Sequence, residues 1–188
     1  MDALLIALLG SLVGEIGDKG QLLALALAAR FQRNGAVIAG VAAAAIANAA
    51  IGAAAGAFLA PMLGSDARLL FLALALIFLG GGMLWPVGQP DVLANWRLGP
   101  FLTTALGLFI LGFGDGAQFL ILGIAVRTAD PSLAATGGAI GIIAATVPVV
   151  LFRDRLFKAL PLRVIRRGGG VLMLVIGLAV TVSALHLA

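Results

Sequence analysis

The chain alternates long apolar stretches with short polar ones, and this pattern predicts its elements. A helix needs about 20 apolar residues to cross the hydrocarbon core of a bilayer. Stretches of suitable length lie at 3–29, 36–59, 69–85, 101–126, 132–152 and 168–187. The breaks between them hold prolines, glycines and charged residues, which are typical of turns. We therefore predict six transmembrane helices joined mostly by short connections.

Composition supports this prediction of an integral membrane protein. Of the 188 residues, 62% are hydrophobic and 11% are charged, against about 25% charged residues in a soluble domain. The stretches are rich in Ala, Leu and Gly and lack the alternation of an outer-membrane barrel, which predicts an all-α fold. The start of the chain, 1–29, lacks a basic region and a clear cleavage site. We interpret it as a retained span rather than a signal peptide.

The basic residues predict the orientation in the membrane. A net charge of +4 would suit nucleic acid, but the basic residues lie between the apolar stretches, so we expect no nucleic-acid partner. The positive-inside rule places the side with more Lys and Arg in the cytoplasm, which puts both termini outside. That side holds Arg30, Arg33, Arg97, Arg153, Arg155, Lys158, Arg163, Arg166 and Arg167, and the other side holds Arg68 and Arg127.

Two further expectations follow from these segments. The connection 153–167 is basic and predicts a short surface helix. No organellar targeting segment is visible. We therefore expect a multi-pass protein of the bacterial inner (plasma) membrane.

The two halves of the chain resemble each other at an offset of 97 residues. Gly17 and Asp18 then fall on Gly114 and Asp115, and the same shift aligns Gln21 with Gln118, Arg30 with Arg127 and Gly40 with Gly137. Each half has three spans, so the second copy enters the membrane from the opposite face, as in the inverted repeats of secondary transporters. We predict repeats at 1–86 and 101–188 around a cytoplasmic connection, 87–100. Chance alignment of Gly, Ala and Leu is the alternative.

Charged residues interrupt the first apolar stretch. The segment 14–21 reads G-E-I-G-D-K-G-Q, and 112–118 is its weaker echo, G-F-G-D-G-A-Q. Charges inside a membrane span are costly and usually mark a transport pathway. On a helix Glu15, Asp18 and Gln21 share one broad face. The surrounding glycines allow close helix packing or local unwinding of the helix; they include Gly14, Gly17 and Gly114.

Together the two segments predict a cation site made of oxygen ligands. Glu15, Asp18 and Asp115 supply carboxylates, while Gln21 and Gln118 supply amide oxygens, a set that suits Ca²⁺ or Mn²⁺. The chain has no Cys and its single His is His186. With Lys19 the charges sum to −2, which one divalent ion neutralises. Buried carboxylates are costly when unneutralised, so protons should compete with the metal.

The same residues allow a structural interpretation. Lys19 could pair with Glu15 or Asp18 and hold helices together, although three carboxylates leave charge unpaired. We give Lys19 a gating or charge-pairing role. Asn48 is expected to form a helix–helix hydrogen bond. Four threonines are expected to bond their own helix backbones: Thr103, Thr104, Thr136 and Thr146.

The segment from Glu15 to Lys19, followed by Gln21, resembles the E-x-G-D-K-[TS]-Q-L signature of the Gdt-type family of small cation/proton exchangers. The resemblance spans six predicted helices and both motif copies. It implies exchange of Mn²⁺ or Ca²⁺ for protons, with Mn²⁺ export in bacterial members. It also implies Glu15, Asp18 and Asp115 as metal and proton residues. The chain departs from the signature at Gly20, Gly112, Gly116 and Ala117.

The expected function is therefore export of a divalent cation in exchange for protons, with the cation as substrate and no tightly bound cofactor. Two alternatives stay open. One is a channel formed by several copies of the chain and lined by Asp18 and Asp115, because the sequence allows a homo-oligomer. The other is an exporter of a small organic cation or amino acid, in which the absence of a Glu at Gly112 makes room for the substrate. An enzyme is not expected, because no Ser/His/Asp set is present.

Overall fold

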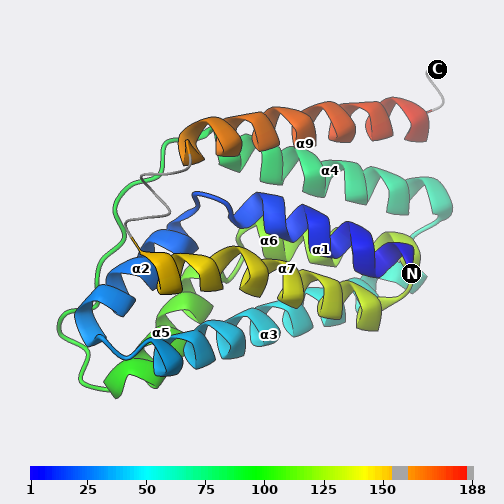
Figure 1. Cartoon of the computed structure of the whole chain (residues 1–188). Coiled ribbons are helices and arrows are strands. Elements are labelled where there is room, and N and C mark those ends of the chain that lie inside the picture. Colours follow the sequence, from blue (N-terminus) through cyan, green and yellow to red (C-terminus); the bar gives the residue numbers. More distant parts are fainter. Residues whose placement is uncertain (154–160, 186–188) are drawn as a thin grey trace.

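The computed structural model describes residues 1–153 and 161–185 (Figure 1). Over these ranges the chain is helical, with no strand. The helices are α1 (Asp2–Glu15), α2 (Lys19–Phe31), α3 (Asn34–Leu59), the 3₁₀ turn η1 (Ala60–Met62), α4 (Ser65–Leu84), α5 (Gly99–Gly112), α6 (Gly116–Thr128), α7 (Pro131–Phe152) and α9 (Leu162–Ala184). The all-α prediction is confirmed for this part of the chain.

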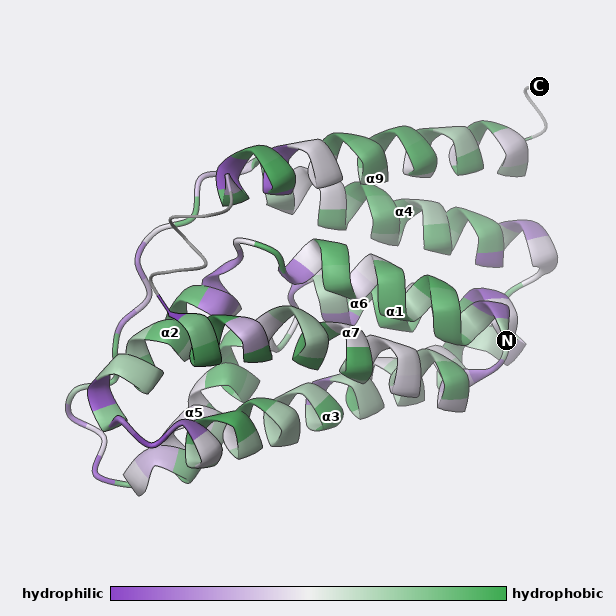
Figure 2. Cartoon of the chain, in the orientation of Figure 1, coloured by the Kyte–Doolittle hydropathy of each residue, from purple (hydrophilic) through white to green (hydrophobic). Residues whose placement is uncertain are grey.

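In the described part of the chain, four helical segments are long and apolar enough to cross a membrane: 34–62, which joins α3 and η1, then α4, α7 and α9. The helices α5 and α6 together make a fifth candidate, bent by 66° at the break between them. The first predicted span is likewise divided into α1 and α2. Figure 2 shows that most residues along the helices are apolar, while hydrophilic residues concentrate at the ends of the bundle and at the helix breaks. The chain is thus a multi-pass helical protein.

The predicted boundaries need one correction. The last apolar stretch was placed at 168–187, but α9 begins at Leu162 and takes Arg163, Arg166 and Arg167 into its first turns. The central connection lies between α4 and α5, as the prolines of 87–100 predict. Arg155, Lys158 and His186 lie outside the described residues, as do residues 154–160 of the surface helix predicted at 153–167, whose last six residues belong to α9 instead.

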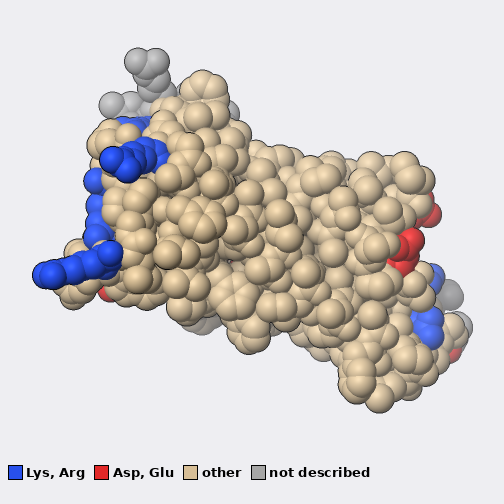
Figure 3. Space-filling view, turned by 90° about the horizontal axis from the view of Figure 1, so that it is seen from below, with Lys and Arg blue, Asp and Glu red and all other residues tan. Residues whose placement is uncertain are grey.

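The charged residues separate toward the two ends of the bundle. Both chain termini lie at one end, since α1 starts there and α9 ends there (Figure 1). Lys and Arg side chains gather at the opposite end, while acidic side chains and fewer basic ones lie at the end with the termini (Figure 3). The described part of the chain therefore has the charge asymmetry that the sequence predicts.

Positions that are 97 residues apart have similar backbone structure as well as similar sequence. Helices α1 and α5 both have 14 residues, and α2 and α6 both have 13. Gln32 and Ala129, which lie at equivalent positions, end their helices in left-handed conformations with φ of 53° and 55°. The equivalent helices α1 and α5 nevertheless start from opposite ends of the bundle (Figure 1).

The packing of the helices departs from this symmetry around α4 and α9. Helix α4 lies against α6 as well as against α9. The approach to α6 is close, because a Cβ atom on Gly116 or Gly123 would lie 2.8 Å from Leu79 or Ala75, respectively. By the offset, α9 should pack on α2 in the same way, but the described residues of these two helices make no comparable contact.

Candidate functional site

Both polar segments lie where a helix is interrupted. Helix α1 ends at Glu15, and Ile16 is extended; Gly17 then takes a left-handed conformation with φ of 70°, and Asp18 caps α2. The second copy repeats these steps at Phe113, Gly114 and Asp115, with φ of 75° at the glycine. Glycine adopts such angles without steric cost because it lacks a Cβ atom. The sequence pattern therefore folds into two matching breaks.

The two glutamines hold these breaks in shape. The Gly17 N–H donates to Gln21 Oε1 at 2.9 Å, and the Gly114 N–H donates to Gln118 Oε1 at 2.6 Å. The same glutamines reach a neighbouring helix, since Gln21 Nε2 donates to the Ala145 carbonyl at 2.8 Å. Both side chains are buried. The amide oxygens predicted as supporting ligands are thus engaged by the backbone in this conformation.

The two capping aspartates have different partners. Asp115 Oδ1 accepts from the Gln118 N–H at 2.8 Å, which satisfies a free donor in the first turn of α6. Asp18 makes no such side-chain bond to α2. Its Oδ1 atom lies 3.2 Å from Nη2 of Arg166 instead. Equivalent carboxylates are therefore held by different groups in the two halves.

Arg166 is a site residue that the sequence analysis placed in a cytoplasmic connection. It is 9% exposed, while Arg163 and Arg167 are exposed. Besides Asp18, its guanidinium donates to the carbonyls of Gly82, Met83 and Trp85 at 2.7 to 2.9 Å. These carbonyls end α4 and lack helical partners. Nothing in the sequence distinguishes Arg166 from its basic neighbours, because its burial depends on how α9 packs.

This ion pair changes the predicted charge of the site. Lys19 was the expected partner of Glu15 or Asp18, but the ion pair among the described residues joins Asp18 to Arg166. Three carboxylates, with Lys19 and Arg166 as two cations, leave a formal charge of −1 rather than −2. Arg166 would therefore compete with a cation for the Asp18 carboxylate.

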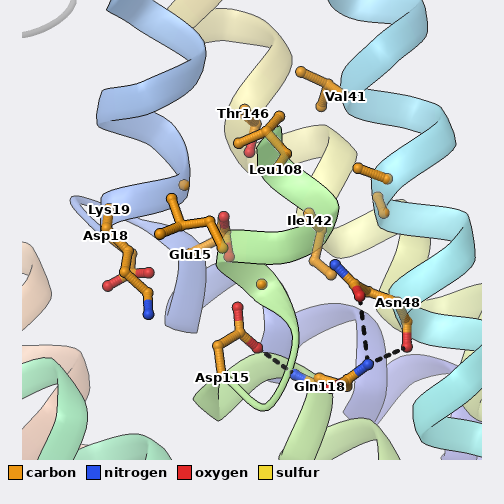
Figure 4. A pocket seen from close by; sticks show the side chains of 15 residues that line it. Glu15, Asp18, Lys19, Val41, Asn48, Leu108, Asp115, Gln118, Ile142 and Thr146 are labelled. Carbon is orange, nitrogen blue, oxygen red and sulfur yellow. Dashed lines mark hydrogen bonds between the residues drawn. The ribbon is translucent and has the colours of Figure 1, made fainter. Parts of the chain in front are cut away.

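The charged groups lie between two neighbouring cavities. The smaller one, of about 30 Å³, has a largely apolar lining that also includes the polar residues Glu15, Asp18, Lys19, Asn48, Asp115 and Thr146 (Figure 4). A volume of this size holds about one or two water-sized occupants. The larger cavity, of about 430 Å³, shares the three carboxylates and Lys19 and reaches Arg166 and the exposed segment 85–90. The structure thus brings the predicted charged residues to a shared wall.

Glu15 and Gly20 fit together at this wall. Glu15 is 7% exposed. A Cβ atom built on Gly20 would collide with Glu15 Oε1. The carboxylate occupies the space beside Gly20, where the family signature carries Thr or Ser. Among the described residues, however, no three Asp, Glu, His or Cys side chains are grouped closely enough to hold a metal ion. The carboxylates share a cavity wall without forming a coordination shell.

Two polar residues of this wall were assigned only structural roles from the sequence. Asn48 Nδ2 donates to the Phe109 carbonyl at 3.3 Å, which is the predicted helix–helix bond, but Asn48 also lines the smaller cavity. Thr104 and Thr136 bond their own helices as predicted. Thr146 does not, and neither does Thr103: their buried hydroxyls have no partner in the described residues. Thr146 lines the smaller cavity.

The sequence also matches a known family over nearly its whole length. The family described as "Divalent cation/proton antiporter GDT1" matches residues 3–91 and 100–187. The chain belongs to the GDT1 family of divalent cation/proton antiporters. The two matched segments of this GDT1 protein begin 97 residues apart, the offset at which its helix breaks coincide. The resemblance seen in the Glu15–Lys19 motif is thereby confirmed.

A curated relative supports the same class. A protein named "Putative manganese exporter" from Vibrio cholerae serotype O1 (strain ATCC 39541 / Classical Ogawa 395 / O395) is 31% identical over 180 residues. The aligned region covers 95% of this GDT1 chain and 90% of the relative. No solved structure matches the chain. The family and the relative are transporters, so this GDT1 protein is a cation transporter and not an enzyme.

Proposed function

We propose that this protein exchanges a divalent cation, Mn²⁺ or Ca²⁺, for protons and exports the cation from the cytoplasm of a bacterial cell through its inner membrane. The observation that carries the proposal is the shared wall of the two cavities. Glu15 and Asp18 from one helix break and Asp115 from the other face the same space. Carboxylate oxygens are the ligands that such hard cations prefer.

The geometry supports access to this site from the basic end. The larger cavity reaches 85–90, which follows α4 at the end where Lys and Arg gather (Figures 1 and 3). The positive-inside rule makes that end cytoplasmic. A cation would thus enter from the cytoplasm and meet the carboxylates at the end of the larger cavity. Export follows if a second conformation opens the site to the other side, as in transporters built from repeats.

The function is tested by cation uptake into proteoliposomes with an imposed pH gradient. We expect gradient-driven uptake of Mn²⁺ or Ca²⁺ by the wild type. Asp18→Asn and Asp115→Asn should each abolish uptake, because each removes a carboxylate from the site while keeping its size. Asp2→Asn, at an exposed position in the first turn of α1, is the matched control and should transport normally.

Other outcomes would support the alternatives. Flux that does not saturate with cation concentration and ignores the pH gradient would indicate a channel. Gradient-driven amino acid flux that Mn²⁺ does not compete with would indicate an organic substrate. Normal uptake by Asp115→Asn would exclude the second helix break from the site and contradict the proposed ligand set.

A further inference from the structure

The two halves of the site differ at two pairs of equivalent positions, where one half has a polar side chain and the other has Gly or Ala. Glu15 corresponds to Gly112, and Ala145 corresponds to Asn48, each at the 97-residue offset. The first half-site joins the break after Glu15 to α7 at Ala145, and the second joins the break after Gly112 to α3 at Asn48. Each half-site thus combines one polar side chain with one residue that has little or no side chain.

Hydrogen bonds show that Ala145 and Asn48 are structurally equivalent. Gln21 Nε2 donates to the Ala145 carbonyl at 2.8 Å, and Gln118 Nε2 donates to the Asn48 carbonyl at 3.1 Å. Each glutamine also binds the left-handed glycine of its own break. The equivalence of the two positions therefore rests on contacts as well as on sequence.

The amide of Asn48 fills the space that a side chain at position 112 would need. A Cβ atom on Gly112 would lie 2.7 Å from Asn48 Nδ2 and 3.4 Å from Asp115 Oδ2. A real Cβ atom does not come within 3.0 Å of another heavy atom. A glutamate at 112 and the present conformation of Asn48 therefore exclude each other. Figure 4 shows Asn48 and Glu15 on opposite sides of the pocket.

The Asn48 amide is buried but loosely held. The residue is 6% exposed, and its side chain makes bonds of 3.3 Å to the Phe109 carbonyl and 3.4 Å from Gln118 Nε2. Both distances exceed the usual 2.9 to 3.0 Å. Little is lost when such an amide turns its oxygen toward a cation, and amide oxygens are common ligands of Ca²⁺. The unpartnered hydroxyl of Thr146 lines the same cavity.

We infer that Asn48 replaces the carboxylate missing at position 112 and is a neutral oxygen ligand for the transported cation in the second half-site. This inference rests on the proposed function. It makes the ligand set three carboxylates and one amide, one negative charge fewer than two complete motifs would supply. Asn48 then sets how strongly the site attracts a divalent cation.

The test measures Mn²⁺ binding to the purified, detergent-solubilised protein by the electron paramagnetic resonance signal of free Mn²⁺. Asn48→Ala should weaken binding on the order of tenfold, the loss expected for a contact that supports a metal site. Asn48→Asp keeps the size and adds a charge, so it should bind Mn²⁺ more tightly. Thr104→Ala removes a buried polar group that bonds its own helix and serves as the control with unchanged affinity.

A double variant separates ligation from packing. Gly112→Glu alone should weaken binding, because its Cβ atom pushes the Asn48 amide out of its present place and away from the cation. Adding Asn48→Ala to it should restore binding to the wild-type level or better. If Asn48 had only a structural role, Asn48→Ala would lower the thermal stability of the protein without these changes in Mn²⁺ affinity.

The failures are distinguishable. If the wild type binds neither Mn²⁺ nor Ca²⁺, the proposed function and this inference both fail. If the wild type binds Mn²⁺ but Asn48→Ala binds equally well, the inference alone is overturned. A double variant no better than Gly112→Glu would also overturn it.

Discussion

At the scale of single residues, each helix break depends on one glycine and the glutamine that binds it. Gly114 has φ of 75°, and no atom lies within 4 Å of where its Cβ would be. A side chain at this position therefore meets no neighbour, and its whole cost comes from the backbone conformation. For an L-residue other than glycine that cost is about 1–2 kcal/mol.

Gly114→Ala should accordingly lower the free energy of unfolding by about 1–2 kcal/mol. Gly81→Ala is the matched control, since Gly81 is inside helix α4 and also has no atom near its Cβ position. It should raise stability by up to about 1 kcal/mol, because alanine favours helix more than glycine does. Reversible unfolding of both variants in detergent checks this. Equal effects would show that the left-handed turn is absent in solution.

The residues of the site were predictable to different degrees. Glu15, Asp18 and Asp115 stand out because charges are rare in apolar stretches, and the structure brings them to one cavity wall. Arg166 and Thr146 do not stand out. Their roles depend on which way a helix face points, and hydrophobic pattern alone does not fix that for a helix surrounded by lipid and protein. For Asn48 the sequence predicted a helix–helix hydrogen bond, but only the structure shows that its amide lies beside Gly112.

At the scale of elements, Arg166 joins three helices. It holds the last carbonyls of α4 and the aspartate that begins α2, while it belongs to α9. Sequence predicted α4 to within four residues, because its apolar stretch is long, but it placed the start of α9 six residues late and did not separate α2 from α1. It allowed unwinding at the three glycines of 112–116 but did not fix the bend of 66° between α5 and α6, because glycines within an apolar stretch permit a straight helix as well.

Arg166→Gln should have two opposite effects. Loss of the guanidinium leaves Asp18 and the end of α4 without their partner. Because Asp18 is partly exposed, the loss of unfolding free energy should fall below the about 3–5 kcal/mol of a fully buried ion pair. The site, however, becomes more negative by one charge, so Mn²⁺ binding should become tighter. Thermal unfolding and Mn²⁺ titration of the same sample measure both effects. Arg167→Gln, at the exposed neighbouring position, should change neither stability nor Mn²⁺ binding. Weaker Mn²⁺ binding by Arg166→Gln would contradict the idea that Arg166 and the cation compete for Asp18.

At the scale of the whole molecule, the two halves have equivalent elements that start from opposite ends of the bundle (Figure 1). Gly35 and Ser132 illustrate this, since they are 97 residues apart, both are exposed, and each lies in the first turn of its helix, α3 or α7. An inverted repeat places such equivalent positions on opposite sides of a membrane.

Because the chain has no cysteine, Gly35→Cys and Ser132→Cys each introduce one thiol that can be labelled. In cells, a membrane-impermeant maleimide should label Ser132→Cys from outside and should reach Gly35→Cys only after the membrane is opened. This pattern follows from the positive-inside rule, with the Arg-rich end in the cytoplasm. Labelling of both variants from the same side would refute the inverted arrangement, and the reverse pattern would refute the orientation.

The contact of α4 with α6, which has no counterpart between α9 and α2 in the described residues, bears on the energy balance of the transport cycle. In a transporter built from repeats, the second state follows when the halves exchange their packing. Leu79 now rests on Gly116. The exchange would bring Ile176 against Lys19, a long cation in place of a hydrogen atom. In such an exchange the two states would differ in this contact, and a cation that binds one state more tightly would shift the balance between them.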